Sequence, residues 1–271
     1  MRTIAVVNLK GGSGKTTTAL ALAVGMGRRL PRRKRLLLID GDPQANATMT
    51  MLEGRTPAEP TLGQVLLGEA EAVEAIRSTR CPQVDILPAD SDLANCTLLL
   101  AEELGRERRL RSALRTVEGT YEACIIDAPP QLSLVLVNIL QAVTEIVVPV
   151  DAGLYSVAGL GRLQETVDQV RKHLDHAELH IIGLVLTRAM KNKATRDLER
   201  QLRESYGDLV YRTSIPHSVK VEESHARHRT VLEHAPKSPA AVAFEQLITE
   251  VLKHGQIQRH ARRSDSKHDA A

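Results

Sequence analysis

Short apolar runs alternate with helix-like segments along almost the whole chain. The runs that predict strands cover residues 3–8, 35–40, 84–88, 122–127, 145–150, 180–187 and 208–215. Between and after them, apolar residues recur at the spacing of a helix, which predicts helices over 16–29, 93–115, 132–142, 157–173, 195–206 and 238–253. Alternating strands and helices favour right-handed crossovers. We therefore expect an α/β fold, a doubly wound and mostly parallel sheet with helices on both faces.

The composition indicates a core of aliphatic side chains. Hydrophobic residues make up 42% of the 271 residues but aromatic residues only 2%, so Leu, Val, Ile and Ala must fill the interior. Such a core suits a parallel sheet that is buried on both faces. We expect a single domain over residues 1–254 and a disordered, polar and basic tail over residues 255–271, because the tail holds only one large apolar side chain, Ile257.

Several classes of protein are disfavoured by what the chain lacks. Its three cysteines are an odd number without CxxC spacing, so neither a disulfide framework nor a zinc site is indicated. No apolar run approaches the roughly 18 residues of a membrane span, and no signal peptide precedes the first strand. We expect a cytoplasmic protein with no membrane partner.

The most specific chemical signal is a glycine-rich turn that joins the first strand to the first helix. Residues 10–17 read Lys-Gly-Gly-Ser-Gly-Lys-Thr-Thr. Such a turn aims several backbone N–H groups at one point, where a phosphate chain can bind. We expect Lys15 to reach the β- and γ-phosphates and the Thr16 hydroxyl to complete the shell of a Mg²⁺ ion. The nucleotide-binding candidates in this turn are Lys10, Gly11, Gly12, Ser13, Gly14, Lys15, Thr16 and Thr17.

The turn departs from the ordinary P-loop pattern, which requires a glycine where Leu9 stands. A second lysine, Lys10, lies at the mouth of the loop instead. This deviant Walker A box resembles the ParA/MinD family of dimerising ATPases, and residues 1–253 are most similar to its Soj/ParA branch. The resemblance implies a P-loop NTPase fold, hydrolysis of ATP to ADP and phosphate, and ATP or ADP with Mg²⁺ as cofactors. It also implies an ATP-bound homodimer in which Lys10 reaches the partner's nucleotide.

Two other strands end in carboxylates. Asp40 and Asp42 close one apolar run, and Asp127 closes another. Ligands of such sheets bind beyond the carboxyl ends of the strands, so all three side chains are expected near the phosphates. The resemblance implies that Asp42 orients the attacking water, that Asp40 lies deeper and supports the Mg²⁺ shell, and that Asp127 holds a Mg²⁺-bound water.

The resemblance extends to the base and to the dimer face. It places Thr187 and Pro216 around the adenine, and it likens residues 155–160 to the segment that borders the partner subunit. The expected catalytic residues are Lys10, Lys15 and Asp42.

Basic residues are concentrated late in the chain. Residues 188–229 hold ten Lys or Arg against six Asp or Glu, although the whole chain carries only +3. Such a run is either a solvated helix face or a surface for DNA. The basic run at residues 28–35 is interpreted as a solvated connection. The candidate DNA contacts are Lys220 first, then Arg188, Lys191, Lys193 and Arg196, and last Arg227 and Arg229.

These patterns favour a partition ATPase. We expect an ATP-bound dimer that binds double-stranded DNA nonspecifically on the nucleoid, is released when a ParB-like centromere-binding protein stimulates hydrolysis, and segregates a chromosome or plasmid. One alternative is a ParA-like positioning ATPase for a non-DNA cargo. Another is a MinD-like division-site regulator, which is disfavoured because the tail lacks an amphipathic membrane helix.

Overall fold

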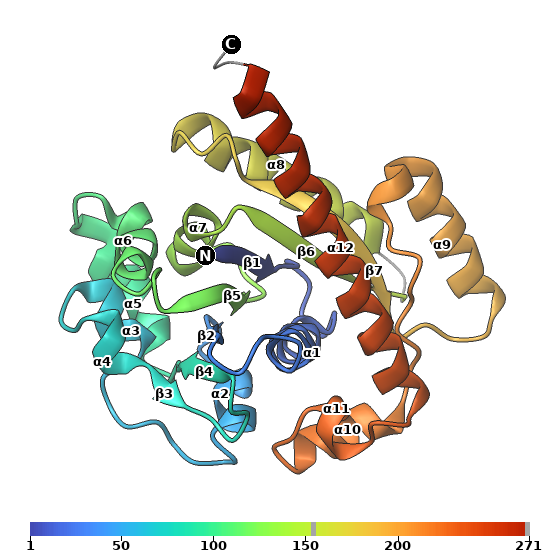
Figure 1. The fold of residues 1–271 in the computed structure, drawn as a ribbon, viewed down its shortest axis with the longest axis horizontal. Coiled ribbons are helices and arrows are strands. Elements are labelled where there is room, and N and C mark those ends of the chain that lie inside the picture. The colour runs from blue at the N-terminus through green and yellow to red at the C-terminus, as the bar shows by residue number, and fades with distance from the viewer. Residues whose placement is uncertain (153–155, 269–271) are drawn as a thin grey trace.

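Seven strands form one sheet in the order β3-β4-β2-β5-β1-β6-β7 (Figure 1). The computed structural model describes residues 1–152 and 156–268. The strand pairs are parallel except for β3 with β4, which confirms the doubly wound, mostly parallel α/β fold. The strands are β1 (Arg2–Val6), β2 (Arg35–Asp40), β3 (Arg77–Ser78), β4 (Val84–Leu87), β5 (Tyr121–Asp127), β6 (Glu145–Asp151) and β7 (His180–Thr187).

Helices cover both faces of the sheet, and each face has its own apolar core. Successive side chains of a strand point to opposite faces, so Ile4 of β1 joins the core beneath α1 and α12 while Ala5 joins the core beneath α7 and α8. The helices are α1 (Lys15–Gly27), α2 (Asn46–Met51), α3 (Leu62–Leu67), α4 (Ala72–Ala75), α5 (Leu93–Leu99), α6 (Arg109–Arg115), α7 (Leu134–Ala142), α8 (Ser156–His173), α9 (Lys193–Tyr206), α10 (Val219–Ala226), α11 (Val231–His234) and α12 (Pro239–His268).

The strand expected at residues 208–215 is wrong. The chain forms a short 3₁₀ helix over Gly207–Leu209 and then pairs with the sheet edge only through isolated bridges. The backbone N–H groups of Arg212 and Thr213 donate to the carboxylate of Glu250 in α12. The Glu250 carboxylate therefore accepts hydrogen bonds that the carbonyl groups of a neighbouring strand would otherwise accept.

The helix expected at residues 93–115 is interrupted. α5 ends at Leu99, and Gly105 has a φ of 69°, in the left-handed region, before α6 begins at Arg109. Glycine reaches that region without the steric cost that other residues bear, so the chain can turn there. The single predicted helix becomes two, both packed on the same face of the sheet.

The last helix is longer than expected. We predicted its end near residue 253, but α12 continues to His268, and residues 254–268 contain no proline that would interrupt it. The division of the chain into a domain over 1–254 and a tail over 255–271 stays a prediction. No helix in the described part of the chain, α12 included, is long and apolar enough to cross a bilayer.

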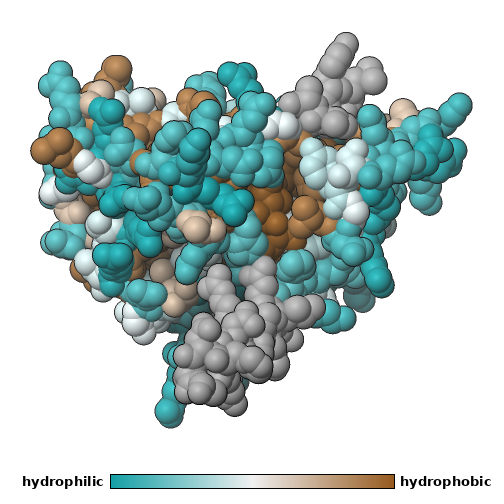
Figure 2. Space-filling model, turned by 90° about the horizontal axis from the view of Figure 1, so that it is seen from above, coloured by the Kyte–Doolittle hydropathy of each residue, from teal (hydrophilic) through white to brown (hydrophobic). Residues whose placement is uncertain are grey.

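The surface of the molecule is mainly polar on the face drawn in Figure 2. Hydrophilic residues cover most of that face, and hydrophobic residues gather in a band near its middle. The large aliphatic side chains are mostly buried in the two cores on either side of the sheet. The aliphatic interior expected from the composition is therefore present.

α12 lies against a helix from the first part of the chain. It packs against α1, and the approach is so close at Gly25 that an added Cβ would lie 2.2 Å from Cδ1 of Ile248. A larger residue at this position would require the Ile248 side chain to move. The contact holds α1, which follows the glycine-rich turn, between the sheet and α12 (Figure 1).

A nearly buried ion pair joins the connection between β3 and β4 to α11. The guanidinium of Arg80 donates two hydrogen bonds of 2.8 Å to the carboxylate of Glu233 in α11. It also donates to the carbonyl of Thr50 in α2 at 2.7 Å. The side chains of Arg80 and Glu233 are only 14% and 12% exposed, so the pair lies largely out of water.

Replacing Glu233 by glutamine is expected to lower the free energy of unfolding by about 3 kcal/mol at pH 7, because Arg80 is left charged and unpaired. Burial works against ionisation of Glu233, but hydrogen bonds from Arg80 and Thr230 outweigh it and lower the pKa of its carboxyl from 4.5 to about 2. A lowered folded-state pKa gives stability that is present above the unfolded-state value and is lost as pH falls toward 2. Urea unfolding between pH 7 and pH 2, followed by circular dichroism, measures both effects.

A matched control is Asp197→Asn on α9, which breaks an exposed pair with Arg200 and should cost well under about 1 kcal/mol. Equal effects of the two substitutions, or a difference between wild type and Glu233→Gln that persists unchanged at pH 2, would contradict the role given to the Arg80–Glu233 pair.

Candidate functional site

A cavity of about 760 Å³ lies at the carboxyl ends of the strands. The glycine-rich turn and the start of α1 form one end of it, and α2, residues 215–218 and α10 form its walls. The structure therefore brings three separate parts of the predicted site to one hollow. The predicted residues that line it are Gly11, Gly12, Gly14, Lys15, Thr16, Thr17, Asp42, Thr187, Arg188 and Pro216.

The glycine-rich turn is shaped for an anion. Gly12 and Gly14 have φ values of 71° and 87°, which only glycine adopts without strain. No side chain caps the start of α1 at Lys15, so the first N–H groups of the helix lack an intrahelical partner. Together with the positive end of the helix dipole, these donors favour a phosphate at the end of the cavity.

The side chains of Thr187 and Asn8 hold this turn in place. The hydroxyl of Thr187, at the end of β7, donates to the carbonyl of Ser13 at 2.8 Å. Asn8 accepts a hydrogen bond from the backbone N–H of Lys10 at 2.8 Å and donates one to the carbonyl of Pro149 in β6 at 2.7 Å. The turn is thus anchored to the two strands on one side of β1.

Lys15 is the cation at the centre of the site. It is only 6% exposed, and its Nζ donates to the carbonyl of Lys10 at 3.2 Å. Burial lowers the pKa of Lys15, while the carboxylates of Asp127 and Asp42 oppose that shift. A buried ammonium that is short of acceptors is suited to bind anionic phosphate oxygens.

Asp127 is fully buried at the end of β5, and neither carboxylate oxygen has a hydrogen-bond partner within the described residues. Burial, followed by the negative charge of Asp40, raises the pKa of Asp127 well above its usual value, while Thr16 and Lys15 oppose the rise. Unsatisfied carboxylate oxygens beside a threonine hydroxyl match the oxygen ligands that Mg²⁺ prefers. The residues present therefore fit a magnesium ion held by Asp127 and Thr16.

Asp40 lies deeper than the cavity lining and is already engaged by the protein. Its carboxylate accepts hydrogen bonds from the backbone and the hydroxyl of Thr48, at 2.7 and 2.8 Å, and from the backbone of Asp42 at 3.2 Å. Burial raises the pKa of Asp40 to about 6, although the bonds from Thr48 work against the shift. Its predicted part in the Mg²⁺ shell stays a prediction, and its contacts fix the turn after β2.

Gly41, in the turn after β2, has no room for a side chain. The backbone N–H of Gly41 donates to the carbonyl of Asp127 at 2.9 Å. A Cβ at Gly41 would lie 2.6 Å from Cδ1 of Ile139 and 2.9 Å from that same carbonyl. Glycine is therefore required for the close approach of β2 and β5, which sets Asp40 opposite Asp127 in the register of the sheet.

Asp42 reaches the cavity from this turn. The side chain is 8% exposed, and its Oδ1 accepts a hydrogen bond from the backbone N–H of Gln44 at 2.9 Å. That local bond leaves the second carboxylate oxygen available on the cavity side, where a water could be held. The position agrees with the predicted role of Asp42 and does not test it.

Lys10 does not line the cavity. Its Nζ forms an ion pair of 3.2 Å with Asp151 at the end of β6. The Lys10 side chain is 37% exposed and that of Asp151 14%, so the pair lies at the surface beside the mouth of the site. Asp151 was not predicted from the sequence, and the reach of Lys10 to a partner stays a prediction.

The two predicted base contacts belong to the wall of the cavity. Thr187 and Pro216 both line it. The segment that carries Pro216 is held beside β7 because the backbone of Ile215 donates to the carbonyl of Leu186 at 2.7 Å. Residues 155–160, expected at the dimer face, begin at position 155, which lies outside the described residues.

Several residues of the cavity wall were missed. Most of them belong to α2, to α10 and its flanks, and to α12, whose approach to the glycine-rich turn depends on tertiary packing. Helices of six and eight residues are too short to give a clear periodic signal. The lining residues outside the predicted set are Thr18, Asn46, Met49, Thr50, Pro130, Ile215, His217, Ser218, Val221, Glu222, His225, His228 and Phe244.

The candidate DNA contacts lie along the β7 edge of the molecule, on α9, α10 and the loops around them (Figure 1). Lys220 is exposed and is paired with Glu223 on the same helix at 2.8 Å. Within the described part of the chain, the other six make no ion pair. These six are Arg188, Lys191, Lys193, Arg196, Arg227 and Arg229, all exposed.

The basic run at residues 28–35 is different, because several of its cations are used within the protein. Arg29 pairs with Glu245 and Lys34 pairs with Glu122, while Arg35 pairs with Asp85. These contacts agree with the interpretation of this run as a connection rather than a binding surface.

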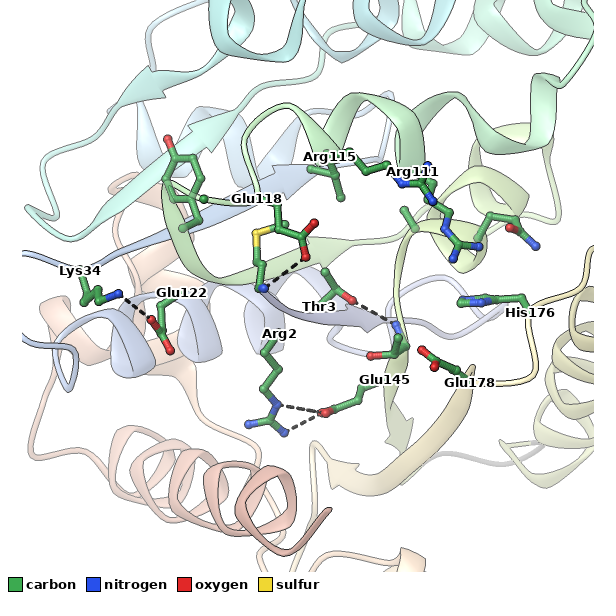
Figure 3. A pocket seen from close by; sticks show the side chains of 17 residues that line it. Arg2, Thr3, Lys34, Arg111, Arg115, Glu118, Glu122, Glu145, His176 and Glu178 are labelled. Atoms are coloured by element: carbon green, nitrogen blue, oxygen red, sulfur yellow. Dashed lines mark hydrogen bonds and ion pairs between the residues drawn. The ribbon is translucent and has the colours of Figure 1, made fainter. Parts of the chain in front are cut away.

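A second cavity of about 760 Å³ lies at the amino ends of β1, β5 and β6 (Figure 3). Many of its charges are paired with one another, as in the bidentate contact of Arg2 with Glu145 and the contact of Lys34 with Glu122. It has no glycine-rich turn and no helix start among its lining residues. The first cavity is therefore the candidate nucleotide site.

Comparison with known proteins assigns the family. A family model described as an AAA domain (AAA_31) matches residues 1–181. The chain is 36% identical over 255 residues to the chromosome partitioning protein ParA of Caulobacter vibrioides, covering 93% of this chain and 94% of that protein. It is 37% identical to the chromosome-partitioning ATPase Soj of Thermus thermophilus over 93% and 96% of the two chains. The chain belongs to the ParA/Soj family.

The ParA/Soj chain is therefore an ATPase with ATP or ADP and Mg²⁺ as cofactors. Among solved structures, it is similar to cobyrinic acid a,c-diamide synthase from Mycobacterium smegmatis, which was crystallised with an ATP analogue and magnesium. The TM-score is 0.80 at 28% identity, covering 94% of this chain and 96% of that one. The fold and the cofactors inferred from the sequence are thus confirmed.

Proposed function

We propose that this ParA-family ATPase forms a dimer around ATP, binds double-stranded DNA nonspecifically as that dimer, and leaves the DNA when a ParB-like centromere-binding protein stimulates hydrolysis. The cycle would operate on the nucleoid in the cytoplasm and segregate a chromosome or plasmid. The observation that carries the proposal is a nucleotide cavity lined by Arg188, one of six exposed cations at the β7 edge that form no ion pair within the described residues. Relatives named for chromosome partitioning support it.

Within the cavity, each charged side chain would have its own task in hydrolysis. Lys15 would bind the β- and γ-phosphate oxygens, and Asp42 would hold the attacking water in line with the γ-phosphate. Asp127 and Thr16 would hold Mg²⁺, which when bound neutralises negative charge on the phosphates. The burial of Lys15 and Asp127 strengthens these interactions because little water competes for them.

Dimerisation would change the partner of Lys10. In the single chain its ammonium is paired with Asp151 at the surface. The side chain of Lys10 is 37% exposed, so a nucleotide phosphate on a second subunit would reach it from solvent and replace Asp151. Lys10 would then join the two sites across the interface.

Pairing of two subunits would also explain why DNA binding depends on ATP. A nonspecific binder neutralises phosphates and releases counterions, and its affinity grows with the number of cations it presents. One chain presents the six unpaired cations and Lys220 at a single edge. A dimer would present two such edges to one duplex.

The proposal is tested by DNA co-sedimentation with ATP, ADP and no nucleotide, using duplexes of unrelated sequence. Binding should require ATP and should be equal for all sequences. ATP turnover should rise when a ParB-like protein is added. Equal binding in ADP, or preference for one sequence, would contradict the proposal.

Replacing Lys220 by glutamate is expected to weaken ATP-dependent binding to all duplexes alike, because each subunit then repels a phosphate that its lysine had neutralised. The slope of log affinity against log salt should become shallower by about 0.9 for each phosphate that is no longer neutralised. Dimerisation in ATP, followed by size-exclusion chromatography, should be unchanged.

Lys172→Glu is the matched control, because Lys172 is an exposed lysine on α8 and not on α9, α10 or the loops around them, and its reversal changes the net charge equally. If both substitutions weaken DNA binding to the same extent, total charge rather than the β7 edge governs binding.

A further inference from the structure

α10 turns one face toward the nucleotide cavity. Ser218, Val221, Glu222 and His225 all line it, and their spacing of three to four residues places them on one side of the helix. Ser218 caps the helix with its hydroxyl, which accepts a hydrogen bond from the backbone of Lys220. The face therefore begins two residues after Pro216 and extends for about two turns.

At the far end of this face, His225 meets the phosphate end of the cavity. Its Nε2 is hydrogen-bonded to the hydroxyl of Thr17 at 3.1 Å. Thr17 lies in the first turn of α1, two residues after Lys15, where the free N–H groups point to the expected phosphates. The imidazole is thus positioned near the phosphates and not only near the base.

His225 belongs to the lining of the open cavity. The residue is exposed within the open cavity, and Thr17 is its hydrogen-bond partner in the described structure. His217 and His228 line the same cavity. No group of three or more His, Cys, Asp or Glu in the described residues could hold a metal ion, so these histidines do not form a metal site.

We propose that His225 is a nucleotide-binding residue, which exchanges its contact with Thr17 for a phosphate oxygen and holds that oxygen as an imidazolium. A hydrogen bond from a charged donor to a phosphate is among the strong ones in proteins. The inference rests on the ATPase function of the family and is independent of the proposal for DNA.

The charge of His225 links nucleotide binding to pH. Although the residue as a whole is exposed, partial desolvation of its ring lowers the pKa of His225, and the carboxylate of Glu222 opposes that shift. The lowered pKa favours the neutral ring in the free protein, and an anion that binds beside the ring favours uptake of a proton. The charged and titratable groups that share the cavity with it are Lys15, Asp42, Arg188, His217, Glu222 and His228.

The direction of the pH effect follows from this proton uptake. A group whose pKa is raised in the complex makes binding tighter as pH falls through the raised value, and the gain levels off below the pKa of the free protein. Nucleotide affinity should therefore rise from pH 8.5 to pH 5.5. The phosphate pKa of free ADP is the same in every experiment, so a difference in pH dependence between variants reports on His225.

The test is calorimetric titration of the full chain with Mg-ADP and with adenosine between pH 5.5 and pH 8.5. His225→Gln, which keeps a neutral hydrogen-bonding side chain, should bind ADP about tenfold more weakly than wild type at pH 6 and nearly equally at pH 8.5. Wild type should take up protons on binding, as measured in two buffers of different ionisation enthalpy, and His225→Gln should not. Adenosine, which has no phosphate, should bind both equally.

His217→Gln is the control, because His217 lines the same cavity but its imidazole lies 3.8 Å from the carboxylate of Glu222 on α10. It should retain the wild-type pH profile. The inference is overturned if His225→Gln keeps that profile, or if it loses affinity for adenosine as much as for ADP, because the histidine would then act on the base or only on the fold. Loss of the pH effect in His217→Gln instead would move the role to that residue.

Discussion

Replacing Lys15 by alanine is expected to abolish ATP binding, with affinity falling on the order of 100-fold or more, because a buried ammonium that faces two phosphates is removed. Dimerisation and DNA binding should disappear with it if both require ATP. Titration with a fluorescent ATP analogue, with and without Mg²⁺, measures the affinity. Thermal unfolding verifies that the variant folds.

Thr16→Ala is the matched comparison for this experiment. Its hydroxyl is predicted to complete the Mg²⁺ shell, so this variant should lose affinity mainly when Mg²⁺ is present. Lys15→Ala should lose it in both conditions. Normal ATP binding by Lys15→Ala would show that the glycine-rich turn is not the phosphate site.

Asp42→Asn is expected to bind ATP like wild type and to hydrolyse it roughly 10²- to 10⁴-fold more slowly, which is the usual contribution of a positioned general base. The amide can still accept the hydrogen bond from the backbone of Gln44, so the turn should keep its shape while the charge that orients water is removed. Single-turnover hydrolysis separates the chemical step from binding. Under the proposed cycle, the ATP-bound dimer should then persist on size-exclusion chromatography.

Lys10→Ala gives the contrasting phenotype. It removes the surface pair with Asp151 and no contact inside the cavity, so the single chain should still bind ATP. It should remain a monomer and fail to hydrolyse ATP. A variant that dimerises and turns over like wild type would remove the argument for a lysine that acts across the interface, and hydrolysis by Asp42→Asn at the wild-type rate would remove the assignment of the water-orienting carboxylate.

The parts of the site that could be predicted are those whose geometry is local. Residues 10–17 form a turn whose shape follows from glycine and from the start of a helix. Asp127 closes a buried strand, so its place at the carboxyl edge follows from the parallel sheet alone. The order of strands and helices could be anticipated for the same reason, because hydrophobic periodicity is a property of short segments.

The parts that could not be predicted depend on contacts between distant segments. The region near residue 212 is apolar enough for a strand, but the carboxylate of Glu250 takes its N–H groups. The pair of Lys10 with Asp151 depends on how β6 lies beside β1. His225 lies on a helix of eight residues, and only the folded structure shows that it reaches Thr17 at the start of α1.

The packing of α12 on α1 has a consequence for synthesis of the protein. Phe244 lines the nucleotide cavity, and Ile248 fills the notch at Gly25 behind the glycine-rich turn. On the ribosome, residues 10–17 leave the exit tunnel long before Phe244 and Ile248 are synthesised. The side of α1 that packs on α12 therefore stays exposed during that time. The nascent chain therefore cannot complete the lining of its nucleotide site until Phe244 and Ile248 have been translated.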